Sequence, residues 1–499
     1  MAELAPAGPY PPGDYPVVIV GSGPGGLQTS YHLSRFGVEH ALISSDDAPG
    51  GMFRRFPIFQ RLITWTKLHA PVERGDPAYE WFDWNSLLGE EPNHRSVLPG
   101  LMDGTSYFPS RPEMEAGLRS FVDRAGIDCR YGCEWLSTRR DDQGFVLGTS
   151  DGEYRCRVVV FAVGMAEPWK PSIPGLDDVP HYVELKDAKH YADKTVFLIG
   201  KRNSGFELAD GLLPWARQIV LASPRPARIS VLARSTAAAR ARYLQPYEDH
   251  VLGGGNLVLD ATIERVERNS DASTVHIRGT TRPGTMTIEA DAVIAATGFS
   301  VPLGDLRDLG VVTFHQDRLP AQTPYWESAS VPGIYFAGAI TQGSIGMKKY
   351  GIPSNSAAVH GFRYNARLLA RHIAEKHMGV SFPRPTLKPE QVVDHLLGKA
   401  RRGPDLWNQR SYLAQVVEFS PDDGITDAGC VPLAHFVDVT GPDAVAITVE
   451  TDADGDIHPA LYLRRSGTVS EHLLGSDPLH NFESAAHRKA ATALLTGLI

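Results

Sequence analysis

The chain has 499 residues, a formal net charge of −9 at pH 7, and 42% apolar against 21% charged residues. A single hydrophobic core stops growing at roughly 250–300 residues, so this length predicts more than one domain. The composition is that of an ordinary globular protein and excludes a disordered or fibrous class. The acidic balance gives no field that attracts polyanions, so nucleic acid is not an expected partner.

Residues 1–16 are rich in proline and are expected to form a flexible leader. They show no basic region followed by an apolar stretch, and no later run approaches the roughly 18 apolar residues of a membrane span. The sequence therefore predicts a chain that makes no membrane contact and resides in the cytoplasm.

The cysteines do not form a pair of the C-x-x-C type that a dithiol relay uses. Because no histidine or further cysteine lies close by in the sequence, we expect buried structural thiols and no metal site. The four residues are Cys129, Cys133, Cys156 and Cys430.

The first predicted elements are a strand, a glycine turn and a helix. Residues 17–20 (VVIV) are a β-branched run that leads into GSGPGG, and an apolar-periodic helix follows from Leu27. Residues 38–44 predict the next strand. Residues 51–110 are rich in aromatic side chains but show no clean period, which is typical of chain that packs over another structure.

A helix is predicted at about 111–125, and the continuous apolar run at 157–164 predicts a buried parallel strand. The proline-rich residues 167–175 then mark a boundary. The opening pattern repeats after it, because TVFLIG at 195–200 predicts a strand that leads into GKRNSG and a second helix. This internal repeat predicts a second domain of the same architecture.

Further strands are predicted at 219–223, 229–233, 291–299 and 333–343. A long helix is expected within 354–377, capped by the cluster Ser354, Asn355 and Ser356. The chain after about residue 380 carries no motif and is expected to be a small α+β segment.

These elements predict an α/β fold with two Rossmann-like dinucleotide-binding domains and the C-terminal α+β segment. The expected boundaries are a leader at 1–16, a first domain at 17–175 and 296–378, a second domain inserted at 176–295, and the C-terminal segment at 379–499.

The first turn has the spacing G-x-G-x-x-G between a strand and a helix, at Gly21, Gly23 and Gly26. Glycine at these positions permits the tight turn, the close approach of a diphosphate and helix packing, and the helix N-terminus faces the phosphates. We expect Pro24 and Gly25 to belong to the same site.

An acidic residue is usual about twenty positions further on, where it binds the ribose hydroxyls. Here the position falls at Ser44, with Asp46 and Asp47 close behind. Ser44 is the candidate favoured by register.

The second turn comprises Gly200, Arg202, Asn203, Ser204 and Gly205, with the arginine in place of the middle glycine. The guanidinium group would bring positive charge to the nucleotide, while its Cβ prevents the closest approach. An ordinary α/β turn is the alternative.

The strand that follows the second turn ends at Ser223, and Arg225 stands two positions later where an acid would favour a bare ribose. A hydroxyl and an arginine instead favour a 2′-phosphate, so NADPH is preferred to NADH.

Over residues 17–375 the chain resembles the flavin-dependent class B monooxygenases, which include flavin-containing, N-hydroxylating and Baeyer–Villiger enzymes. The resemblance rests on six landmarks in order: GSGPGG, GGMF at 50–53, YFPSRPEMEAGL at 107–118, FAVG with the later IPG, GKRNSGFE, and ATGF at 296–299.

The resemblance implies that FAD lies on the first turn and NADPH on the second. It also implies that reduced flavin captures molecular oxygen as a 4a-hydroperoxyflavin and hydroxylates a small-molecule substrate. Further cofactor-binding positions implied in this way are Gly51, Met52, Phe53, Gly164, Gly298 and Gly338.

The Baeyer–Villiger fingerprint is not present, because the corresponding stretch keeps His181 without the expected phenylalanine and glycine. N-hydroxylation of an amine or amino acid is therefore preferred. Sulfide S-oxidation and Baeyer–Villiger oxidation remain alternatives within the oxygenases, and a pyridine-nucleotide flavin reductase is the alternative of another class. A homo-oligomer is an open possibility.

The resemblance places Trp65 where flavin-containing monooxygenases often carry an asparagine near the reactive flavin, with Lys67 two positions later. These two are the candidate catalytic residues, although Trp65 could equally be a core aromatic and Lys67 a solvated lysine.

Residues 343–356 correspond to the loop and helix N-terminus that the family places against the flavin pyrimidine. Lys348 and Lys349 in this loop are candidates for binding an acidic substrate, and a surface lysine pair is the alternative. Ala339 replaces the acid that many flavoproteins use to bind the ribityl chain.

Overall fold

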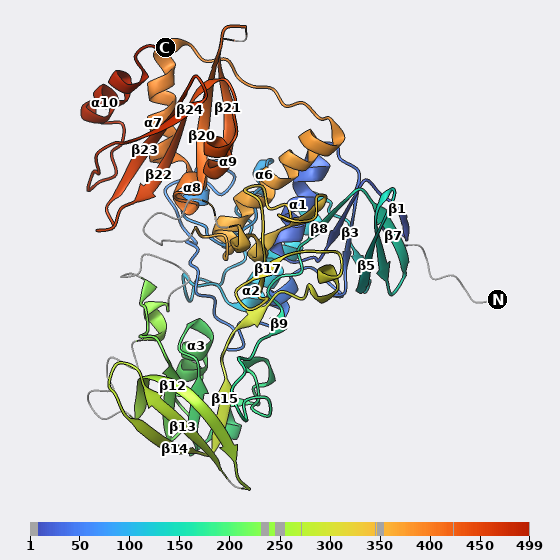
Figure 1. Ribbon diagram of the computed structural model, residues 1–499, viewed down its shortest axis with the longest axis vertical. Helices are drawn as coiled ribbons and strands as arrows, with labels where there is room; N and C mark the ends of the chain where they lie inside the picture. The colour runs from blue at the N-terminus through green and yellow to red at the C-terminus, as the bar shows by residue number, and fades with distance from the viewer. Residues whose placement is uncertain are drawn as a thin grey trace, which may run out of the picture. The chain divides into compact units, whose positions relative to one another are not determined.

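The computed structural model describes residues 8–230, 239–244, 255–270, 272–344, 346, 354–422 and 424–498. The chain forms two compact units (Figure 1). Unit 1 comprises Met1–Arg55, Thr64–Gly164 and Leu303–Ile499, and unit 2 comprises Phe56–Ile63 and Met165–Pro302.

The central sheet of unit 1 is parallel, in the order β19-β8-β2-β3-β4. Its inner strands are apolar and fully buried, which is why the sequence shows continuous apolar runs rather than alternation. The strands are β2 (Val17–Val20), β3 (His40–Ser44), β4 (Arg130–Tyr131), β8 (Val158–Phe161) and β19 (Ile334–Phe336).

Three helices accompany this sheet: α1 (Pro24–Arg35), α2 (Arg111–Ala125) and α6 (Val359–Met378). Helix α1 packs along α6, and α2 begins with a capping box formed by Ser110 and Glu113.

The predicted cap of α6 is wrong. The N-cap is Ala358, whose side chain makes no capping bond, and Ser356 lies outside the helix. The Ser356 hydroxyl instead accepts hydrogen bonds from Asn365 and Gln409. Tertiary partners thus take the oxygen that the local pattern assigns to the helix end.

Unit 1 also contains a four-stranded sheet in the order β1-β7-β6-β5 and a short hairpin. The strands are β1 (Gly13–Asp14), β5 (Trp135–Asp141), β6 (Gly144–Thr149) and β7 (Gly152–Cys156), and the hairpin joins β17 (Thr313–Phe314) to β18 (Leu319–Pro320).

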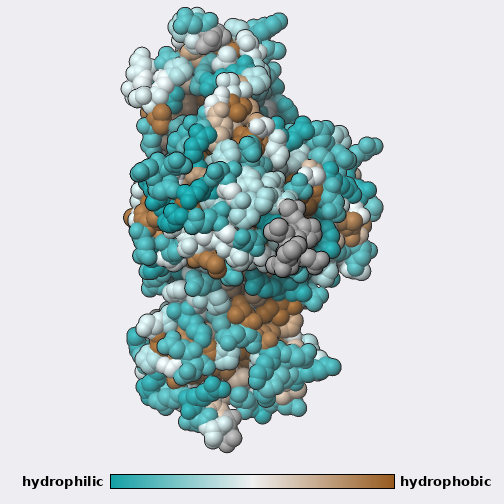
Figure 2. All heavy atoms as spheres, turned by 90° about the vertical axis from the view of Figure 1, so that its right-hand side faces the viewer, coloured by the Kyte–Doolittle hydropathy of each residue, from teal (hydrophilic) through white to brown (hydrophobic). Residues whose placement is uncertain are grey.

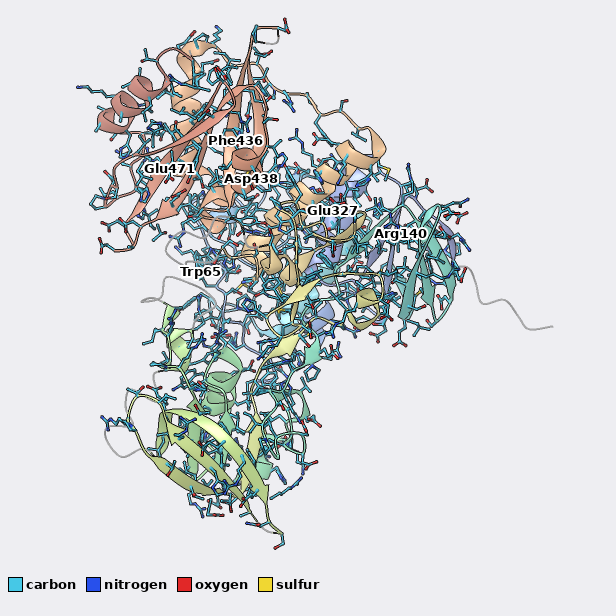
Figure 3. All side chains as sticks on the ribbon, viewed as in Figure 1. Trp65, Arg140, Glu327, Phe436, Asp438 and Glu471 are labelled. Atoms are coloured by element: carbon cyan, nitrogen blue, oxygen red, sulfur yellow. The ribbon has the colours of Figure 1, made fainter. Side chains whose placement is uncertain are left out.

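The C-terminal segment of unit 1 is an antiparallel sheet, β21-β20-β22-β23-β24, with helix α7 packed on β20 and β22. In Figure 3, Phe436 and Asp438 mark helix α9 and Glu471 marks strand β24. This architecture confirms the predicted α+β class. The elements are α7 (Val392–Arg402), α8 (Pro404–Asn408), β20 (Leu413–Ser420), β21 (Gly424–Pro432), α9 (Leu433–Asp438), β22 (Asp443–Thr451), β23 (Ile457–Arg465), β24 (Thr468–Leu473) and α10 (Ala485–Leu495).

Unit 2 contains one sheet in the order β14-β13-β12-β11-β10-β15, in which β10 runs parallel to both of its neighbours. Helix α3 (Asn203–Leu212) follows β10 directly. The strands are β10 (Thr195–Ile199), β11 (Gln218–Ser223), β12 (Asn256–Arg268), β13 (Ser273–Gly279), β14 (Thr285–Ala290) and β15 (Ala292–Ala295), with a separate pair of β9 (Glu167–Pro168) and β16 (Phe299–Ser300).

The predicted α/β fold with two Rossmann-like sheets is confirmed. Of the strand predicted at 229–233, Ile229 forms an isolated bridge with Ala239, and residues 231–238 lie outside the described chain. Residues 56–63, which the sequence pattern leaves in the first domain, pack with unit 2.

The face drawn in Figure 2 is mainly hydrophilic, and apolar side chains gather on it only in small patches. None of the helices in the described ranges is long and apolar enough to cross a membrane.

Candidate functional site

The first glycine turn, residues 21–26, joins β2 to α1 in a conformation that only glycine supports. Gly21 has φ +110°, and its N–H donates to the Ile43 carbonyl over 2.8 Å. A Cβ on Gly21 would lie 2.6 Å from the Ala162 carbonyl oxygen, and one on Gly26 would lie 1.9 Å from the Gly21 carbonyl oxygen. At both glycines, backbone carbonyl oxygens therefore occupy the space that a side chain would need.

Two further glycines predicted for this site, Gly51 and Gly338, pack against the turn, and a third, Gly164, lies beside Met52. A Cβ on Gly25 would lie 2.4 Å from the Gly338 backbone, and a Cβ on Gly51 would lie 2.9 Å from the Gly23 Cα atom. Gly164 lies on the other side of Met52, whose Cγ atom would be 3.5 Å from a Gly164 Cβ. Met52 and half-buried Phe53 belong to a short 3-10 helix, Gly51–Arg54.

Helix α1 begins at this turn with Pro24 in its first turn, no side-chain cap and no acidic residue there. Its first peptide N–H groups therefore remain available to an anion, and the helix dipole favours negative charge at the same place. A side-chain-free backbone at a helix N-terminus fits the diphosphate of a dinucleotide.

Ser44 lies at the end of β3 and is almost completely buried. Its hydroxyl oxygen accepts hydrogen bonds from the Ser22 hydroxyl over 2.8 Å and from the Asp46 N–H over 3.2 Å. The Ser44 hydrogen is left to donate, as a ribose contact would require. Asp47, the neighbouring carboxylate, forms an ion pair with Arg54.

The second glycine turn, residues 200–205, repeats the first within unit 2. Gly200 has φ +120°, and its N–H donates to the Ala222 carbonyl over 2.8 Å. A Cβ on Gly200 would lie 2.3 Å from the Ala296 carbonyl oxygen, and one on Gly205 would lie 2.2 Å from the Gly200 carbonyl oxygen. Gly200 and Gly205 thus make the same close backbone contacts in the second turn that Gly21 and Gly26 make in the first.

The polar residues of the second turn lie around the start of α3. Arg202 is exposed in extended backbone at the N-cap, and half-buried Asn203 accepts the Arg240 N–H over 3.2 Å. Ser204 is half-buried, as is Ser223 at the end of β11, and Arg225 is exposed. The guanidinium groups of Arg202 and Arg225 are thus exposed to solvent.

Lys201 was not predicted as part of the site, and it occupies the position that Ser22 holds in the first turn. Its buried ammonium donates to the Leu259 carbonyl over 2.7 Å and pairs with Asp260. Burial alone would raise the pKa of Asp260, but Lys201 and Thr281 bring it below its usual value. The available signal was a lysine at the position where the first turn has a serine.

Glu207 was also missed, although it lies in α3 two residues after the turn. It is buried, and it accepts the Phe59 N–H over 3.0 Å and the Tyr182 hydroxyl over 2.6 Å. Burial raises the pKa of this carboxyl group. Glu207 therefore holds residues 56–63 on unit 2, a pairing that no local sequence pattern encodes.

Gly298 belongs to unit 2, whereas the other glycines predicted for the FAD site lie in unit 1. Its carbonyl oxygen accepts the Trp169 N–H over 3.0 Å, and the His181 Nε2 atom lies 3.0 Å from the same oxygen. Contacts within unit 2 thus account for its backbone conformation.

Trp65, which is labelled in Figure 3, forms part of an aromatic stack in unit 1. Its ring centroid lies 4.9 Å from that of Trp84, and the Trp84 ring stacks on His360, at the start of α6, with centroids 4.5 Å apart. The backbone beside Trp65 is fixed by the Thr66 hydroxyl, which donates to buried Asp83 over 2.9 Å.

Lys67 is exposed, and its ammonium lies 5.4 Å from the centroid of the Phe82 ring. It does not join the aromatic stack. Lys348 and Lys349, the candidate substrate-binding residues, lie outside the described residues.

All four cysteines are free thiols, three buried and Cys430 half-buried. Burial raises the pKa of every one of them, to about 12 for Cys156 and for Cys430. A redox-active thiol requires the opposite shift, because the thiolate is the reactive form.

Residues 18–338 match the family model described as pyridine nucleotide-disulphide oxidoreductase. Among curated proteins, the FAD-dependent oxidoreductase domain-containing protein 2 of Danio rerio is 25% identical over 452 residues, which cover 80% of this chain and 64% of that protein. The chain thus spans less than two thirds of the length of this relative.

Two solved structures share the fold at low identity. Bacillithiol disulfide reductase of Staphylococcus aureus is 17% identical with a TM-score of 0.54, covering 73% of this chain and 99% of that one. The ornithine N-hydroxylase of Kutzneria sp. 744, solved with reduced FAD, NADP+ and L-ornithine, is 16% identical with a TM-score of 0.54, covering 73% of this chain and 100% of that one. The predicted resemblance to N-hydroxylating flavoenzymes is confirmed at the level of the fold.

Proposed function

The chain belongs to the pyridine nucleotide-disulphide oxidoreductase family, and we propose that it is a member that uses FAD, NADPH and molecular oxygen to hydroxylate a small molecule. The family match supports the predicted class of enzyme, a flavoprotein oxidoreductase with FAD and NADPH as cofactors, and the solved neighbours share the fold. The assignment of each cofactor to a turn, and the reaction itself, are the proposal.

FAD is proposed to bind at the first turn. The close-packed backbone of residues 21–26, with Gly51 and Gly338 against it, leads into the N-terminus of α1, which has no side-chain cap and no acidic residue and so favours a diphosphate there. Ser44 would donate to the ribose, and Met52, Phe53 and Gly164 would lie along the ribityl side.

NADPH is proposed to bind at the second turn. Arg202 stands at the N-cap of α3, where its charge meets the nucleotide diphosphate, and Ser223 and Arg225 stand where the 2′-phosphate of NADPH would lie. Gly200, Asn203, Ser204 and Gly205 complete the turn. A guanidinium group binds phosphate with charge-assisted, often paired hydrogen bonds.

The state of the four cysteines is the observation that favours molecular oxygen as the electron acceptor. NADPH supplies a hydride to FAD, and bound FAD supplies electrons to an acceptor. All four cysteines of the chain carry raised pKa values and none forms a disulfide, so the chain offers no disulfide to accept those electrons. The acceptor is then external, and molecular oxygen with a small-molecule substrate fits the resemblance.

Trp65 is proposed to form a wall of the substrate pocket. Trp65 and Trp84 are half-buried and His360 is completely buried, and such an aromatic surface keeps water from a reacting centre. N-hydroxylation of an amine or amino acid is the preferred reaction, because a neutral amine nitrogen is a good nucleophile and the Baeyer–Villiger fingerprint is missing. Lys67, and Lys348 and Lys349, would then bind a substrate carboxylate.

The test is NADPH oxidation by FAD-loaded protein across amines, amino acids, sulfides and ketones, with product analysis for each compound. We expect amines to stimulate NADPH oxidation and to yield hydroxylated product. Product from sulfides alone, or from ketones alone, would replace N-hydroxylation by S-oxidation or Baeyer–Villiger oxidation.

A flavin reductase that passes electrons to another protein is the second candidate, and the name of the matching family favours it. In that case the same assay gives no oxygenated product with any compound. Reduction of an added disulfide or quinone then proceeds instead, at the expense of NADPH.

A further inference from the structure

The turn between α8 and β20, residues 409–412, contacts two places in the loop that the resemblance puts against the flavin ring. It belongs to the C-terminal segment, for which neither the sequence motifs nor the matching family model, which ends at residue 338, supplies a role. Both contacts are made by buried polar side chains, Gln409 and Tyr412. A buried polar group is retained only where its hydrogen bonds compensate for the loss of water.

The first contact is a hydrogen-bond network made by the side-chain NH2 group of Gln409, whose Oε1 atom has no hydrogen-bond partner among the described residues. Its amide Nε2 donates to the Ser356 hydroxyl over 3.0 Å and to the Asn365 Oδ1 atom over 2.6 Å. Asn365 in turn donates to Ser356 and to the Thr341 hydroxyl, each over 3.0 Å. Thr341 extends the network by donating to the Gly338 carbonyl over 2.7 Å.

Gly338 is the residue that packs against Gly25 of the first turn. The Gln409 network therefore reaches from the C-terminal segment to the backbone of the proposed FAD site. All four side chains of the network are completely buried: Thr341, Ser356, Asn365 and Gln409.

The second contact is made by Tyr412. Its hydroxyl donates to the Ser344 hydroxyl over 2.8 Å, and Ser344 passes its own hydrogen to the Thr323 carbonyl over 3.1 Å. Gly346 has φ +56°, and a Cβ there would lie 2.6 Å from the Tyr412 Cδ2 atom, so the glycine backbone lies directly against the edge of the ring.

The turn that carries these two side chains is itself fixed. The Tyr412 N–H and the Leu413 N–H both donate to the Gln409 carbonyl, over 3.0 Å each, and the Ser411 N–H donates to Val449 of the C-terminal sheet over 2.9 Å. Asp405 of α8 pairs with Lys399 and with Arg367 of α6, over 2.9 Å and 3.5 Å. The sheet thus serves as a rigid support for Gln409 and Tyr412.

We propose that Gln409 and Tyr412 are positioning residues of the flavin site, through which the C-terminal segment fixes residues 338–344, 346 and 354–356 relative to the flavin ring. This rests on the proposed function. Peptide N–H groups and a helix N-terminus in such a loop stabilise the negative charge of reduced flavin only when they are held in place. Releasing the loop should therefore disfavour the reduced state and slow hydride transfer.

The chain offers matched control variants. Gln415→Met repeats the substitution Gln409→Met at another buried glutamine of the C-terminal segment, in strand β20, whose hydrogen bond is to Asp427. Tyr462→Phe repeats Tyr412→Phe at a buried tyrosine that bonds to Glu450. The hydrogen bonds to Asp427 and Glu450 both lie within the C-terminal segment, so each control substitution removes a buried polar contact from that segment.

The experiment measures three properties of the purified, FAD-loaded full chain: the visible absorption and circular dichroism of the flavin, its midpoint potential, and its anaerobic reduction rate by NADPH. For Gln409→Met we expect an altered flavin spectrum, a more negative potential and reduction slowed roughly 10- to 100-fold, the scale of a small misplacement. For Tyr412→Phe, which keeps the ring against Gly346, we expect a smaller change in the same direction.

The two control variants are expected to lower the unfolding temperature but to leave spectrum, potential and reduction rate at wild-type values. If Gln409→Met matches wild type in all three flavin properties, or if Gln415→Met shifts them equally, the positioning role is overturned while the proposed function stands. Wild-type protein that holds no FAD overturns the proposed function, and this inference with it.

Discussion

The two glycine turns share one backbone design but differ in every side chain that faces it. Both end a parallel strand, both begin with a glycine at positive φ whose N–H bonds to the neighbouring strand, and both close with a glycine pressed on the first one's carbonyl group. The first turn then has Ser22, Gly23 and Gly25 where the second has Lys201, Arg202 and Ser204.

The difference teaches which parts of the motif serve the fold and which serve the ligand. The first and last glycines are required by backbone contacts in both units. The positions between them vary: Gly25 must be glycine because Gly338 lies against it, whereas Ser204 carries a side chain at the equivalent place. The first turn offers only peptide groups, and the second adds two cations.

The same comparison extends into the helices. Gln28 of α1 and Glu207 of α3 stand at equivalent positions, seven residues after the first glycine of their turns. Gln28 bonds to both the N–H and the carbonyl group of Leu88, over 2.7 and 3.0 Å, and Glu207 accepts the Phe59 N–H. Each helix thus clamps a distant irregular segment, one with a neutral amide and one with a carboxyl group.

The largest expected effects come from alanine at the closing glycines. Gly26→Ala should lower the affinity for FAD by roughly 100-fold or more. Gly205→Ala should leave FAD bound but lower the affinity for NADPH by a similar factor. In both variants the added methyl group would collide with a backbone carbonyl group that cannot move aside. Flavin content and NADPH titration measure the two effects. Loss of both nucleotides in both variants would show that the two turns are not separate sites.

The second prediction separates the two arginines of the NADPH turn. Arg225→Ala should reduce the preference for NADPH over NADH by roughly 10- to 100-fold, since a charged hydrogen bond to a phosphate contributes about 1.5–3 kcal/mol. Arg202→Ala, at the proposed diphosphate position, should weaken NADPH and NADH alike. Steady-state kinetics with both nucleotides give the comparison, and an unchanged preference in Arg225→Ala would contradict the assignment.

The third prediction concerns Glu207→Gln, which replaces the carboxyl group of Glu207 by the neutral amide that Gln28 carries at the equivalent position. Burial raises the pKa of Glu207, so folding favours its protonated form. Its contribution to stability is then fully present below the pKa of the unfolded chain and is lost as pH rises through the folded value. Glu207→Gln should therefore match wild type in acid and exceed its unfolding temperature by a few degrees at alkaline pH. Melting curves with the same pH dependence in both proteins would rule this out.

The smallest expected effect is at Ser44. Ser44→Ala removes the hydroxyl that accepts from Ser22 and that is proposed to donate to the FAD ribose, so FAD should bind roughly five- to tenfold more weakly, the value of one neutral hydrogen bond. Ser22→Ala serves as the control, because it breaks the bond between the serines but leaves Ser44 in place. Equal FAD affinity in Ser44→Ala and wild type would remove Ser44 from the site.

The sequence predicts the parts of this molecule that local chemistry determines. Apolar runs locate β2, β8 and β10, and the glycine spacing identifies both turns, because each signal lies within about ten consecutive residues. The resemblance to the class B monooxygenases adds that these motifs follow one another in the order found in that family.

The parts that the sequence does not predict depend on contacts between distant residues. The pairing of Glu207 with Phe59, the bond from Lys201 to Asp260 and the network of Gln409 join side chains that no periodicity links. The expected cap of α6 is wrong for the same reason, because Gln409 and Asn365 use the Ser356 hydroxyl.

The central claim is that a nicotinamide nucleotide on the second turn reduces a flavin on the first. Anaerobic titration of FAD-loaded protein with NADPH, followed by the visible absorbance of the flavin, tests it most directly. The account predicts loss of the oxidised flavin bands with one NADPH per FAD, and a much slower loss with NADH. In Arg225→Ala the rate with NADPH should fall towards the NADH rate. Flavin that stays oxidised under excess NADPH, or is reduced equally fast by both nucleotides, would contradict it.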